Sequence, residues 1–446
     1  MKRFDMDFLK KSITGVCINC ADDIFFDSVS TDSRKILKNT LFVPLEGEIY
    51  DGHAFIDDAV ENGTSAFISS KKIEISIPYM LVENTLSAYH ELASAYADRF
   101  NIYKIAITGS NGKTSTKDLL FSCFRQSSKT LKTKGNTNNL IGVPENIFRA
   151  DDQTSYMILE MGMNRKGELK TLSSLVKPDT VIITNVNNSH IGNFLCFDDL
   201  ISAKMEILSF LKKDGLLIVN GDDAHVLSAV PNEIRRKTFG IKQTNDYYPL
   251  KVDMRQSDST VYMSDGEFKI NVPGMGSVYS FLSVYAFCKE HPEIGTSVKT
   301  GLENFIPPSN RMNILTVNEI TIIDDTYNAS PSSVRNAIDV LSRFKGRKIA
   351  ILADMLELGS ETELLHEQIG KFAYEKEIDM LLACGEKAEA YTRYFRNEKA
   401  FFDSKEKLYD HLKNNIKKND IILIKGSRMM KMEEVVNYLK ESKFAL

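Results

Sequence analysis

The stretch Thr108–Lys117, which reads TGSNGKTSTK, contains most of the residues of a phosphate-binding loop. The usual form of that loop reads G-x-x-x-x-G-K-[ST], and its backbone N–H groups surround phosphate oxygens before a helix begins. Gly112, Lys113 and Thr114 fit this form, whereas Ile107 stands where the first glycine is expected. An apolar strand-like run, KIAIT, precedes the loop and a helical pattern follows it, as a phosphate loop requires. The sequence therefore predicts phosphate binding here; the alternative is a strand-helix turn that carries a lysine by chance.

Acidic and imidazole side chains follow the next two strand-like runs. Lys113 is expected to neutralise charge on the terminal phosphates, and the Thr114 hydroxyl is expected to bind Mg²⁺. Glu160 ends the run YMILE, and the carboxyl end of a parallel strand faces the ligand crevice. His190 follows VIITNVNNSH by the same geometry. Each residue alone would more often be a solvated strand end or a hydrogen-bonded loop residue, but beside the phosphate loop both are candidate metal ligands.

Lys204 lies in the stretch DDLISAKMEILSFL, whose apolar residues recur at helical spacing. The apolar residues one or two turns away from it on the same face are Leu200, Ile201, Ile207, Leu208 and Leu211. This spacing directs Lys204 inward. Burial lowers the pKa of a lysine from about 10.4 by up to roughly 3–5 units, which leaves neutral amine that can react with carbon dioxide to form a metal-binding carbamate. The alternative is a lysine at the edge of the apolar face whose ammonium reaches water.

The elements that position these residues fall into three groups. Residues 1–84 mix short strand-like runs, TLFVPL and SAFISS, with turn signals. From Thr85 a helical pattern leads into the strand KIAIT, and YMILEM, DTVIITNV and GLLIVN follow as nearly continuous apolar runs. Such runs are typical of strands that are covered on both faces in a parallel sheet.

A second alternation of strands and helices follows FIPPSNRMN, where Pro307 and Pro308 interrupt the pattern. The runs TIIDD, KIAILAD, MLLACG and DIILIKG belong to this part. The sequence therefore predicts an α/β protein of three domains: a small α/β domain over 1–84, a central phosphate-loop domain with a parallel sheet over 85–308, and a Rossmann-like domain over 309–446.

Composition excludes several classes of protein. The chain has 446 residues with a net charge of −4, which gives no electrostatic attraction to nucleic acid or to an anionic membrane. No run approaches the roughly 18 apolar residues of a membrane span, and Asp5 and Asp7 interrupt the N-terminal stretch, so we expect a cytoplasmic protein. Of the six cysteines only Cys17 and Cys20 are close in sequence, and zinc would need a second pair of ligands. Reduced thiols are expected.

Taken as a set, these residues resemble the Mur ligases, which use ATP to join amino acids or peptides to nucleotide-linked muramyl precursors. The family's phosphate loop has the shortened form T-G-[ST]-N-G-K-T, which accounts for Ile107. The resemblance covers nearly the whole chain and implies the three-domain layout, with the first domain binding the nucleotide sugar. It also implies ATP, Mg²⁺ at two sites, and a carbamylated Lys204. The implied metal ligands are Thr114, Glu160, His190 and Lys204. The implied catalytic residues are Lys113, Glu160, His190 and Lys204.

Longer motifs narrow the resemblance to one activity. The motifs are STDSRKI, LFVPLEG, YDGHAF, KGNTNNLIGVP, LEMGMNRKGEL, DDTYNASPSS, ADMLELG and KGSRMMKME, and the DNPR motif of the diaminopimelate-adding member is absent. They imply an ADP-forming ligase that adds D-alanyl-D-alanine to UDP-N-acetylmuramoyl-tripeptide through an acyl phosphate, in peptidoglycan precursor synthesis. They further imply a cytoplasmic monomer whose active site is completed by domain closure.

The resemblance also assigns binding residues. The nucleotide side comprises Gly109, Ser110, Asn111, Gly112, Lys113, Thr114 and Ser115 with Arg311, Asp325 and Asn328 from the third domain. The acid substrate side comprises Asp32, Ser33, Arg34, His53, Asn138 and Asn139.

The chain departs from the family pattern at two places. Asn187 and Ser189 stand where the family commonly has Gly and Ala before the metal-binding His, and Gly276, Ser277 and Ser280 stand where it has residues that meet adenine. Two alternatives therefore stay open. One is a related ligase that acts on another acid, and the other is a nucleotide-binding regulatory protein that has kept the fold without turnover.

Overall fold

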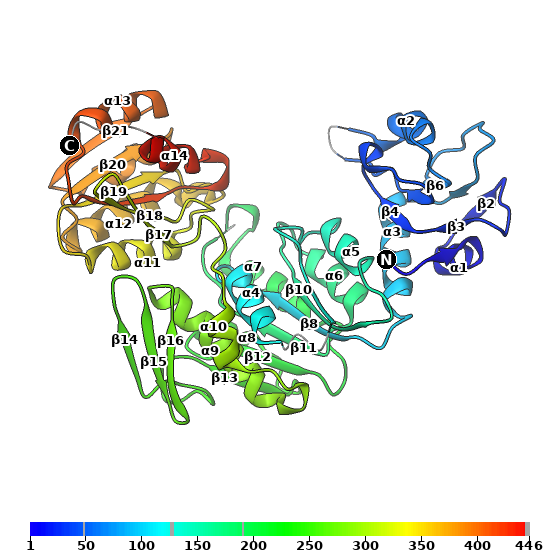
Figure 1. Ribbon diagram of the computed structural model, residues 1–446, viewed down its shortest axis with the longest axis horizontal. Helices are drawn as coiled ribbons and strands as arrows, with labels where there is room; N and C mark the ends of the chain where they lie inside the picture. Colours follow the sequence, from blue (N-terminus) through cyan, green and yellow to red (C-terminus); the bar gives the residue numbers. More distant parts are fainter. Residues whose placement is uncertain (48–49, 125–128, 190, 442–446) are drawn as a thin grey trace.

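The computed structural model describes residues 1–446 except 48–49, 125–128, 190 and 442–446. The chain forms three lobes, and the N-terminal and C-terminal lobes lie at opposite ends of the central one (Figure 1). The α/β class with three domains is confirmed, and the boundaries near residues 84 and 308 stay predictions. Among the described residues, no helix is long and apolar enough to cross a membrane.

The N-terminal lobe is built on a five-stranded sheet in the order β2-β7-β6-β5-β4. Its strands are β2 (Val16–Ile18), β4 (Ser28–Ser30), β5 (Thr40–Phe42), β6 (Ala66–Ser69) and β7 (Tyr79–Leu81). A pair of two-residue strands, β1 (Phe4–Asp5) and β3 (Phe25–Phe26), lies beside helix α1 (Met6–Ser12). Helix α2 (Ile56–Glu61) also belongs to this lobe. β5 and β6 fall within the predicted runs TLFVPL and SAFISS.

The expectation of reduced thiols is wrong at one pair, because a disulfide joins Cys17 and Cys20. Cys17 lies in β2 and Cys20 just beyond its end, where the chain leaves the strand. The turn brings the two Cα atoms to 5.9 Å, within the usual range for a disulfide. Cys123, Cys196, Cys288 and Cys384 are free thiols.

Helix α3 (Thr85–Ala97) connects the first lobe to the second. Its buried face includes Tyr89, Leu92, Ala93 and Tyr96, as the helical spacing predicted. The helix packs against α1 of the first lobe and against α5 (Gly142–Ile147) and α6 (Glu168–Val176) of the second. The Tyr96 hydroxyl accepts a hydrogen bond from the Lys2 backbone N–H and donates one to the Ala150 carbonyl, so it ties the N-terminus to the central lobe.

The central lobe contains a six-stranded parallel sheet in the order β13-β12-β11-β8-β10-β9. Its strands are β8 (Tyr103–Thr108), β9 (Lys129–Lys132), β10 (Thr154–Glu160), β11 (Thr180–Ile183), β12 (Leu216–Asn220) and β13 (Arg236–Phe239). The helices on this lobe, besides α5 and α6, are α4 (Lys113–Cys123), α7 (Phe197–Met205), α8 (Ala224–Ala229), α9 (Met275–Glu290) and α10 (Val298–Asn304).

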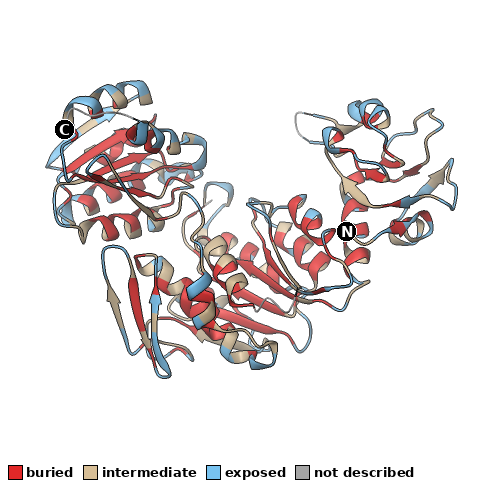
Figure 2. Cartoon of the chain, in the orientation of Figure 1, coloured by how far each residue is buried: buried red, intermediate tan, exposed pale blue. Residues whose placement is uncertain are grey.

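Both faces of this sheet are covered, as the continuous apolar runs predicted. Ile105 and Ile107 of β8 point into a core with α4 and α9, whereas Ala106 points into the opposite core with α3 and α6. The central strands β8, β10, β11 and β12 are buried along most of their length (Figure 2). Since β8 lies between β10 and β11, its end places the phosphate loop at the middle of the sheet.

A small antiparallel sheet, which the sequence reading did not anticipate, follows β13. It consists of β14 (Lys251–Met254), β15 (Ser259–Met263) and β16 (Gly266–Ile270). Val261, Met263 and Ile270 pack against α9 in the core that also holds α4. This sheet therefore supports the helices behind the phosphate loop.

The C-terminal lobe has a six-stranded sheet in the order β17-β18-β22-β19-β20-β21, parallel except for the edge strand β17. The strands are β17 (Asn313–Val317), β18 (Ile320–Asp324), β19 (Lys348–Ala353), β20 (Met380–Cys384), β21 (Glu398–Phe402) and β22 (Ile421–Lys425). Helices α11 (Pro331–Ser342) and α12 (Thr362–Glu375) pack against one face, and α13 (Lys405–Asn415) and α14 (Glu433–Glu441) against the other.

Candidate active site

A cavity of about 1200 Å³ lies where the central and C-terminal lobes meet. Its walls come from the phosphate loop, residues 138–141, the ends of β10 and β12, the start of α9, and residues 325–336 and 425–429 of the C-terminal lobe. Cavities for one small ligand usually measure roughly 300–1000 Å³. This space is therefore large enough for a nucleotide together with part of a second substrate.

The phosphate loop requires glycine at two positions for backbone reasons. Gly109 has φ +144°, and a Cβ atom there would lie 2.0 Å from Thr184 Oγ1 on the neighbouring strand end. Gly112 has φ +82° and caps helix α4, whose first residue is Lys113. The N-terminus of α4 thus faces the cavity, which favours negatively charged groups such as phosphates.

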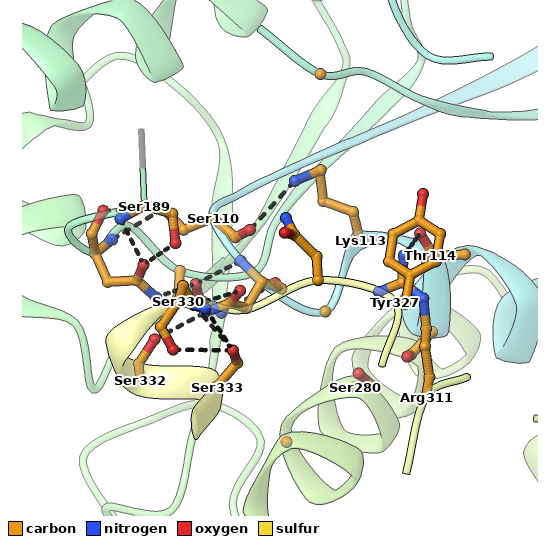
Figure 3. Close-up of a pocket in the computed structure, with 18 of the residues that line it drawn as sticks. Ser110, Lys113, Thr114, Ser189, Ser280, Arg311, Tyr327, Ser330, Ser332 and Ser333 are labelled. Atoms are coloured by element: carbon orange, nitrogen blue, oxygen red, sulfur yellow. Dashed lines mark hydrogen bonds between the residues drawn. The ribbon is translucent and has the colours of Figure 1, made fainter. Parts of the chain in front are cut away.

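Lys113 extends over this loop. Its Nζ donates hydrogen bonds to the carbonyl oxygens of Gly109, at 2.7 Å, and Ser110, at 3.3 Å (Figure 3). Burial lowers the pKa of this ammonium, the nearby Glu160 carboxylate opposes that shift, and Arg311 adds to it. The lysine is held by backbone carbonyls, which an anion in the cavity can replace as its partner.

Thr114 and Glu160 bring two oxygen ligands together. The Thr114 hydroxyl donates a hydrogen bond to Glu160 Oε2 at 2.9 Å, and Asn138 Nδ2 donates one to Glu160 Oε1 at 2.8 Å. Glu160 is buried at the end of β10, where the sequence predicted it. A hydroxyl beside a carboxylate at a phosphate loop is a donor set that suits Mg²⁺.

Lys204 is buried on the inward face of α7, as its spacing predicted, and only 2% of its surface is exposed. It lines the same cavity as Lys113 and Glu160. Burial lowers the pKa of its amine well below the ordinary value, and the charge of Lys113 lowers it further. His190, the remaining predicted metal ligand, lies outside the described residues. Ser189 beside it donates a hydrogen bond from its hydroxyl to Asn187 Oδ1 at 2.7 Å.

The C-terminal lobe contributes the three residues that were predicted on the nucleotide side. Arg311 Nη2 donates a hydrogen bond to Thr114 Oγ1 at 3.1 Å, and its guanidinium lies 3.8 Å from the centre of the Tyr327 ring (Figure 3). Asp325 Oδ2 pairs with Lys425 Nζ at 2.6 Å, and the same ammonium donates to the Asn328 carbonyl at 2.8 Å. All three predicted residues line the cavity.

Lys425, Ser330 and Ser332 also belong to the cavity, although sequence reasoning assigned them no role. Lys425 holds the 325–328 segment, as described above. Asn111 Nδ2 donates a hydrogen bond to Ser332 Oγ at 2.8 Å, and Ser330 Oγ donates one to Asn111 Oδ1 at 3.2 Å. The available signal was the Ser-Pro pair at the start of α11, which is typical of a helix N-terminus.

The residues predicted to bind the acid substrate fall into two places. Asn138 and Asn139 line the cavity, and Asn139 Oδ1 also accepts hydrogen bonds from the backbone at the start of α5. The others lie in the N-terminal lobe and are not among the residues around the cavity. Asp32 and Arg34 form a two-pronged ion pair at 2.9 and 3.0 Å, and the hydrogen bond from Arg34 lowers the pKa of Asp32 to about 2.

Ser33 and His53 complete this group in the N-terminal lobe. Ser33 is buried in the short helical turn that Asp32 caps. The His53 ring is held on both sides, because Nδ1 lies 2.6 Å from Asp51 Oδ1 and Nε2 accepts a hydrogen bond from the Ser70 backbone N–H at 3.1 Å. All four of these residues thus lie in the N-terminal lobe, apart from the cavity.

The residues that depart from the family pattern lie at the start of α9. The Gly276 backbone N–H donates a hydrogen bond to Asn336 Oδ1 of α11 at 3.1 Å. Ser277 Oγ donates to the carbonyl oxygens of Val272 and Gly274, so its hydroxyl holds the helix start. Ser280 lies behind the phosphate loop, where a Cβ on Gly112 would come within 3.5 Å of its hydroxyl.

Comparisons with known families cover most of the chain. Residues 26–107 match the Mur ligase family catalytic domain, residues 107–288 match the Mur ligase middle domain, and residues 310–428 match the Mur ligase glutamate ligase domain.

Among curated relatives, the chain is similar to two proteins named UDP-N-acetylmuramoyl-tripeptide--D-alanyl-D-alanine ligase. The Bacillus subtilis protein is 34% identical, with 93% of each chain covered, and the Escherichia coli protein is 32% identical, with 94% of this chain and 95% of that protein covered.

Two solved structures have the same arrangement of lobes. MurF from Acinetobacter baumannii superposes with a TM-score of 0.90 at 27% identity and covers 99% of this chain and 100% of its own. The MurF ligase from Thermotoga maritima in complex with ADP gives a TM-score of 0.84 at 26% identity and covers 93% of this chain and 97% of its own.

Proposed function

Because the chain belongs to the Mur ligase family, we propose that it is the ATP-dependent ligase that joins D-alanyl-D-alanine to UDP-N-acetylmuramoyl-tripeptide. The observation that carries this proposal is the meeting of Lys113, Thr114 and Glu160 with Arg311 of the C-terminal lobe in one cavity. The relatives that match over nearly the full length are named for this reaction. The reaction belongs to peptidoglycan precursor synthesis, and we place the enzyme in the cytoplasm as a monomer.

The reaction proceeds in two transfers. A carboxylate oxygen of the tripeptide attacks the γ-phosphorus of ATP, the bond from that phosphorus to the β–γ bridging oxygen breaks, and ADP leaves with that oxygen. The amine of D-alanyl-D-alanine then attacks the acyl carbon of the acyl phosphate, inorganic phosphate leaves, and the amine loses a proton. Catalysis of phosphoryl transfer consists mainly of positioning and charge neutralisation.

The chain's own residues supply both effects. Lys113 exchanges its carbonyl partners on the loop for phosphate oxygens, while the N-terminus of α4 adds the positive end of its dipole. Arg311 brings a second cation from the C-terminal lobe to the Thr114 hydroxyl. The approach of the two lobes thus assembles positive charge where phosphate charge must be stabilised.

The donor atoms fit Mg²⁺ at one position directly. Thr114 Oγ1 and Glu160 Oε2, 2.9 Å apart, are oxygen ligands of the kind that Mg²⁺ prefers. Bound Mg²⁺ offsets negative charge on phosphate oxygens. We assign a second Mg²⁺ to Lys204 and His190, which requires Lys204 to carry a carbamate because an ammonium has no lone pair to offer. The lowered pKa of buried Lys204 supports this modification, since it favours the neutral amine.

The N-terminal lobe is the proposed site for the nucleotide-sugar end of the acid substrate. Asp32, Ser33, Arg34 and His53 are its residues, and Asn138 and Asn139 receive the peptide end near Glu160. A substrate that spans both places connects the first lobe to the cavity, so binding is expected to involve movement of the N-terminal lobe.

A matrix of substrates with phosphate release as the readout tests this proposal. UDP-N-acetylmuramoyl-tripeptide with D-alanyl-D-alanine should give ADP and phosphate in a Mg²⁺-dependent reaction, whereas single amino acids should give little turnover. Formation of AMP and pyrophosphate would exclude the acyl-phosphate route. Turnover of another acid with an inert tripeptide would favour the related ligase, and nucleotide binding without turnover of any pair would favour the regulatory protein.

The same matrix tests the nucleotide. Ser277 uses its hydroxyl to hold the start of α9, and Gly276 has no side chain to offer a base. Each lost hydrogen bond to a base weakens recognition by about 0.5–1.5 kcal/mol. ATP should therefore be used, with modest discrimination against other purine triphosphates.

A further inference from the structure

Lys117 is a buried cation in the phosphate-loop helix to which the proposed mechanism gives no role. It lies on α4 one turn beyond Lys113, and only 2% of its surface is exposed. Its Nζ donates hydrogen bonds to the carbonyl oxygens of Thr133 at 3.2 Å and Gly135 at 3.4 Å. The same atom lies 3.5 Å from Asp118 Oδ1 and 3.9 Å from Glu160 Oε2. A buried lysine with partners on its own helix and on two other segments has a defined structural task.

The first of these segments is the end of β10, which carries Glu160. Among the described residues, Lys117 is the only lysine whose ammonium lies within ion-pair distance of this carboxylate. Lys113 is the other lysine nearby, but its ammonium is engaged with the carbonyls of Gly109 and Ser110. Lys117 therefore balances the charge of Glu160 and leaves Lys113 available for phosphate.

The second segment is the chain that follows β9 and leads to Asn138 and Asn139. Lys117 holds its start through the carbonyls of Thr133 and Gly135. Thr133 Oγ1 in turn accepts a hydrogen bond from the Glu160 backbone N–H at 2.9 Å. Asn138 Nδ2 donates a hydrogen bond to the Glu160 carboxylate at 2.8 Å. Glu160 and the loop on the acid-substrate side thus share one buried anchor.

We propose that Lys117 is a positioning residue that holds Glu160 and the 133–139 loop in the arrangement that binds Mg²⁺ with the nucleotide. Without its ammonium, buried Glu160 would have Lys113 as the nearest other lysine, and a pair between them would withdraw one ligand from Mg²⁺ and one cation from phosphate. The carbonyls of Thr133 and Gly135 would also lose their donor, which would release the loop that carries Asn138. This inference rests on the proposed binding of nucleotide and Mg²⁺, but not on the identity of the acid or the amine.

The test measures the effect of Mg²⁺ on ADP binding by calorimetry, in Lys117→Met and in the unsubstituted protein. Linked ligands typically raise each other's affinity by about 5–150-fold, and the factor is reciprocal. We expect Lys117→Met to reduce the Mg²⁺-dependent gain in ADP affinity by at least about fivefold. ADP affinity without Mg²⁺ should fall by a smaller factor, because Lys113 then pairs with Glu160. Lys117→Arg, which keeps the charge, should recover most of the gain.

The matched control is Lys104→Met. Lys104 is also a buried lysine of this lobe, but it lies in β8 at the opposite end of the sheet from the phosphate loop. A comparable loss in Lys104→Met, or a gain preserved within about twofold in Lys117→Met, would overturn the proposal. If Lys117→Met does not fold, Lys117→Gln replaces it under the same criteria, because it also removes the ammonium while keeping a polar side chain. Absence of ADP binding to the unsubstituted protein would instead count against the proposed nucleotide site.

Discussion

Three lysines, of which Lys117 and Lys204 are buried and Lys113 is partly buried, lie near the carboxyl ends of β8 and β10, and their contacts distinguish their roles. Lys113 is held by loop carbonyls, Lys117 lies within ion-pair distance of Glu160, and Lys204 has a strongly lowered pKa caused by burial and by Lys113. Lys113 is thus a cation that must move to its ligand, and Lys117 is a cation that stays fixed. Lys204 is an amine that favours the neutral state.

Lys113→Ala should abolish most activity and leave the fold intact. The side chain ends at the cavity and contacts loop carbonyls, so its removal deletes charge at the phosphates and little core volume. Loss of one such electrostatic contribution typically lowers kcat by roughly 10²–10³-fold. Phosphate release gives the rate and thermal unfolding gives the stability. A variant that unfolds at a much lower temperature, or that keeps its rate, would contradict this role.

Lys204→Ala tests the carbamate. The residue is buried and lines the cavity, so the variant leaves a space that a small acid can enter. Activity should be nearly absent in Lys204→Ala and should return in part when acetate is added, because acetate supplies the missing carboxylate-like oxygens. Acetate should not stimulate the unsubstituted enzyme. An unmodified lysine in a high-resolution crystal structure with nucleotide and bicarbonate would refute the carbamate.

Sequence reasoning found the site residues whose signal is local. Lys113 follows from a motif and Lys204 from the apolar spacing of its own helix. Lys117 stands in the same motif, but its partners Thr133 and Glu160 come from loops and strands that only the folded sheet brings together. Its role could not be read from spacing, and the same holds for Lys425, whose partner Asp325 is 100 residues away in sequence.

At the scale of secondary structure, the central strands were predictable and the edge strands were not. β8, β10, β11 and β12 are continuous apolar runs because both of their faces are buried. β9 reads KTLK and β21 reads EKAFF, and both lie at sheet edges with partly exposed side chains. Charged residues protect such edges from further pairing, and they also remove the apolar signal by which a strand is recognised.

Helix α12 contains a histidine that should make stability depend on pH. His366 is fully buried, its Nε2 accepts a hydrogen bond from the Met355 backbone N–H at 3.0 Å, and its Nδ1 lies 2.6 Å from the Thr362 carbonyl. Burial lowers its pKa, opposed by the Thr362 carbonyl and by Asp354. The Tyr391 ring also packs against the imidazole. The folded lobe therefore holds the ring neutral.

Because the folded pKa lies below the unfolded value near 6.5, the stabilisation is complete above that value and is lost as the pH falls through it. The loss is at most about 1.4 kcal/mol per pH unit for one histidine. Lowering the pH from 7.5 to 5.5 should lower the unfolding temperature of the protein, and His366→Gln should show a smaller decrease over the same interval. An equal decrease in both proteins would show that His366 does not contribute. His90 and His411 also have lowered pKa values, but they are present in both proteins. The difference between the two decreases in unfolding temperature therefore reports on His366 alone.

At the scale of the whole molecule, the C-terminal lobe touches the phosphate loop directly. Ser330 and Ser332 at the start of α11 contact Asn111, and Arg311 contacts Thr114. Two further contacts connect the lobes away from the loop, from the Gly192 N–H to the Glu357 carbonyl at 3.0 Å and from Asn188 Nδ2 to Glu361 Oε2 at 3.3 Å. The sequence reading expected the third domain to reach the nucleotide, and these contacts identify the surfaces that meet.

The contact between α11 and the phosphate loop should influence how often the two lobes are docked. Ser332→Ala removes the hydroxyl that accepts the hydrogen bond from Asn111 and leaves the rest of α11 in place. A neutral hydrogen bond contributes about 0.5–1.5 kcal/mol, so the ratio of docked to separated molecules should fall by roughly 2- to 12-fold. Small-angle scattering should then give a larger mean radius of gyration for Ser332→Ala, and nucleotide with Mg²⁺ should return it toward the value of the unsubstituted protein.

Ser342→Ala is the matched control, because Ser342 lies at the other end of α11 and donates its hydrogen bond to Asp339 within the helix. If both variants leave the radius and the KM for ATP unchanged, the docking of the lobes does not depend on this contact, and Arg311 with Thr114 becomes the pair to test.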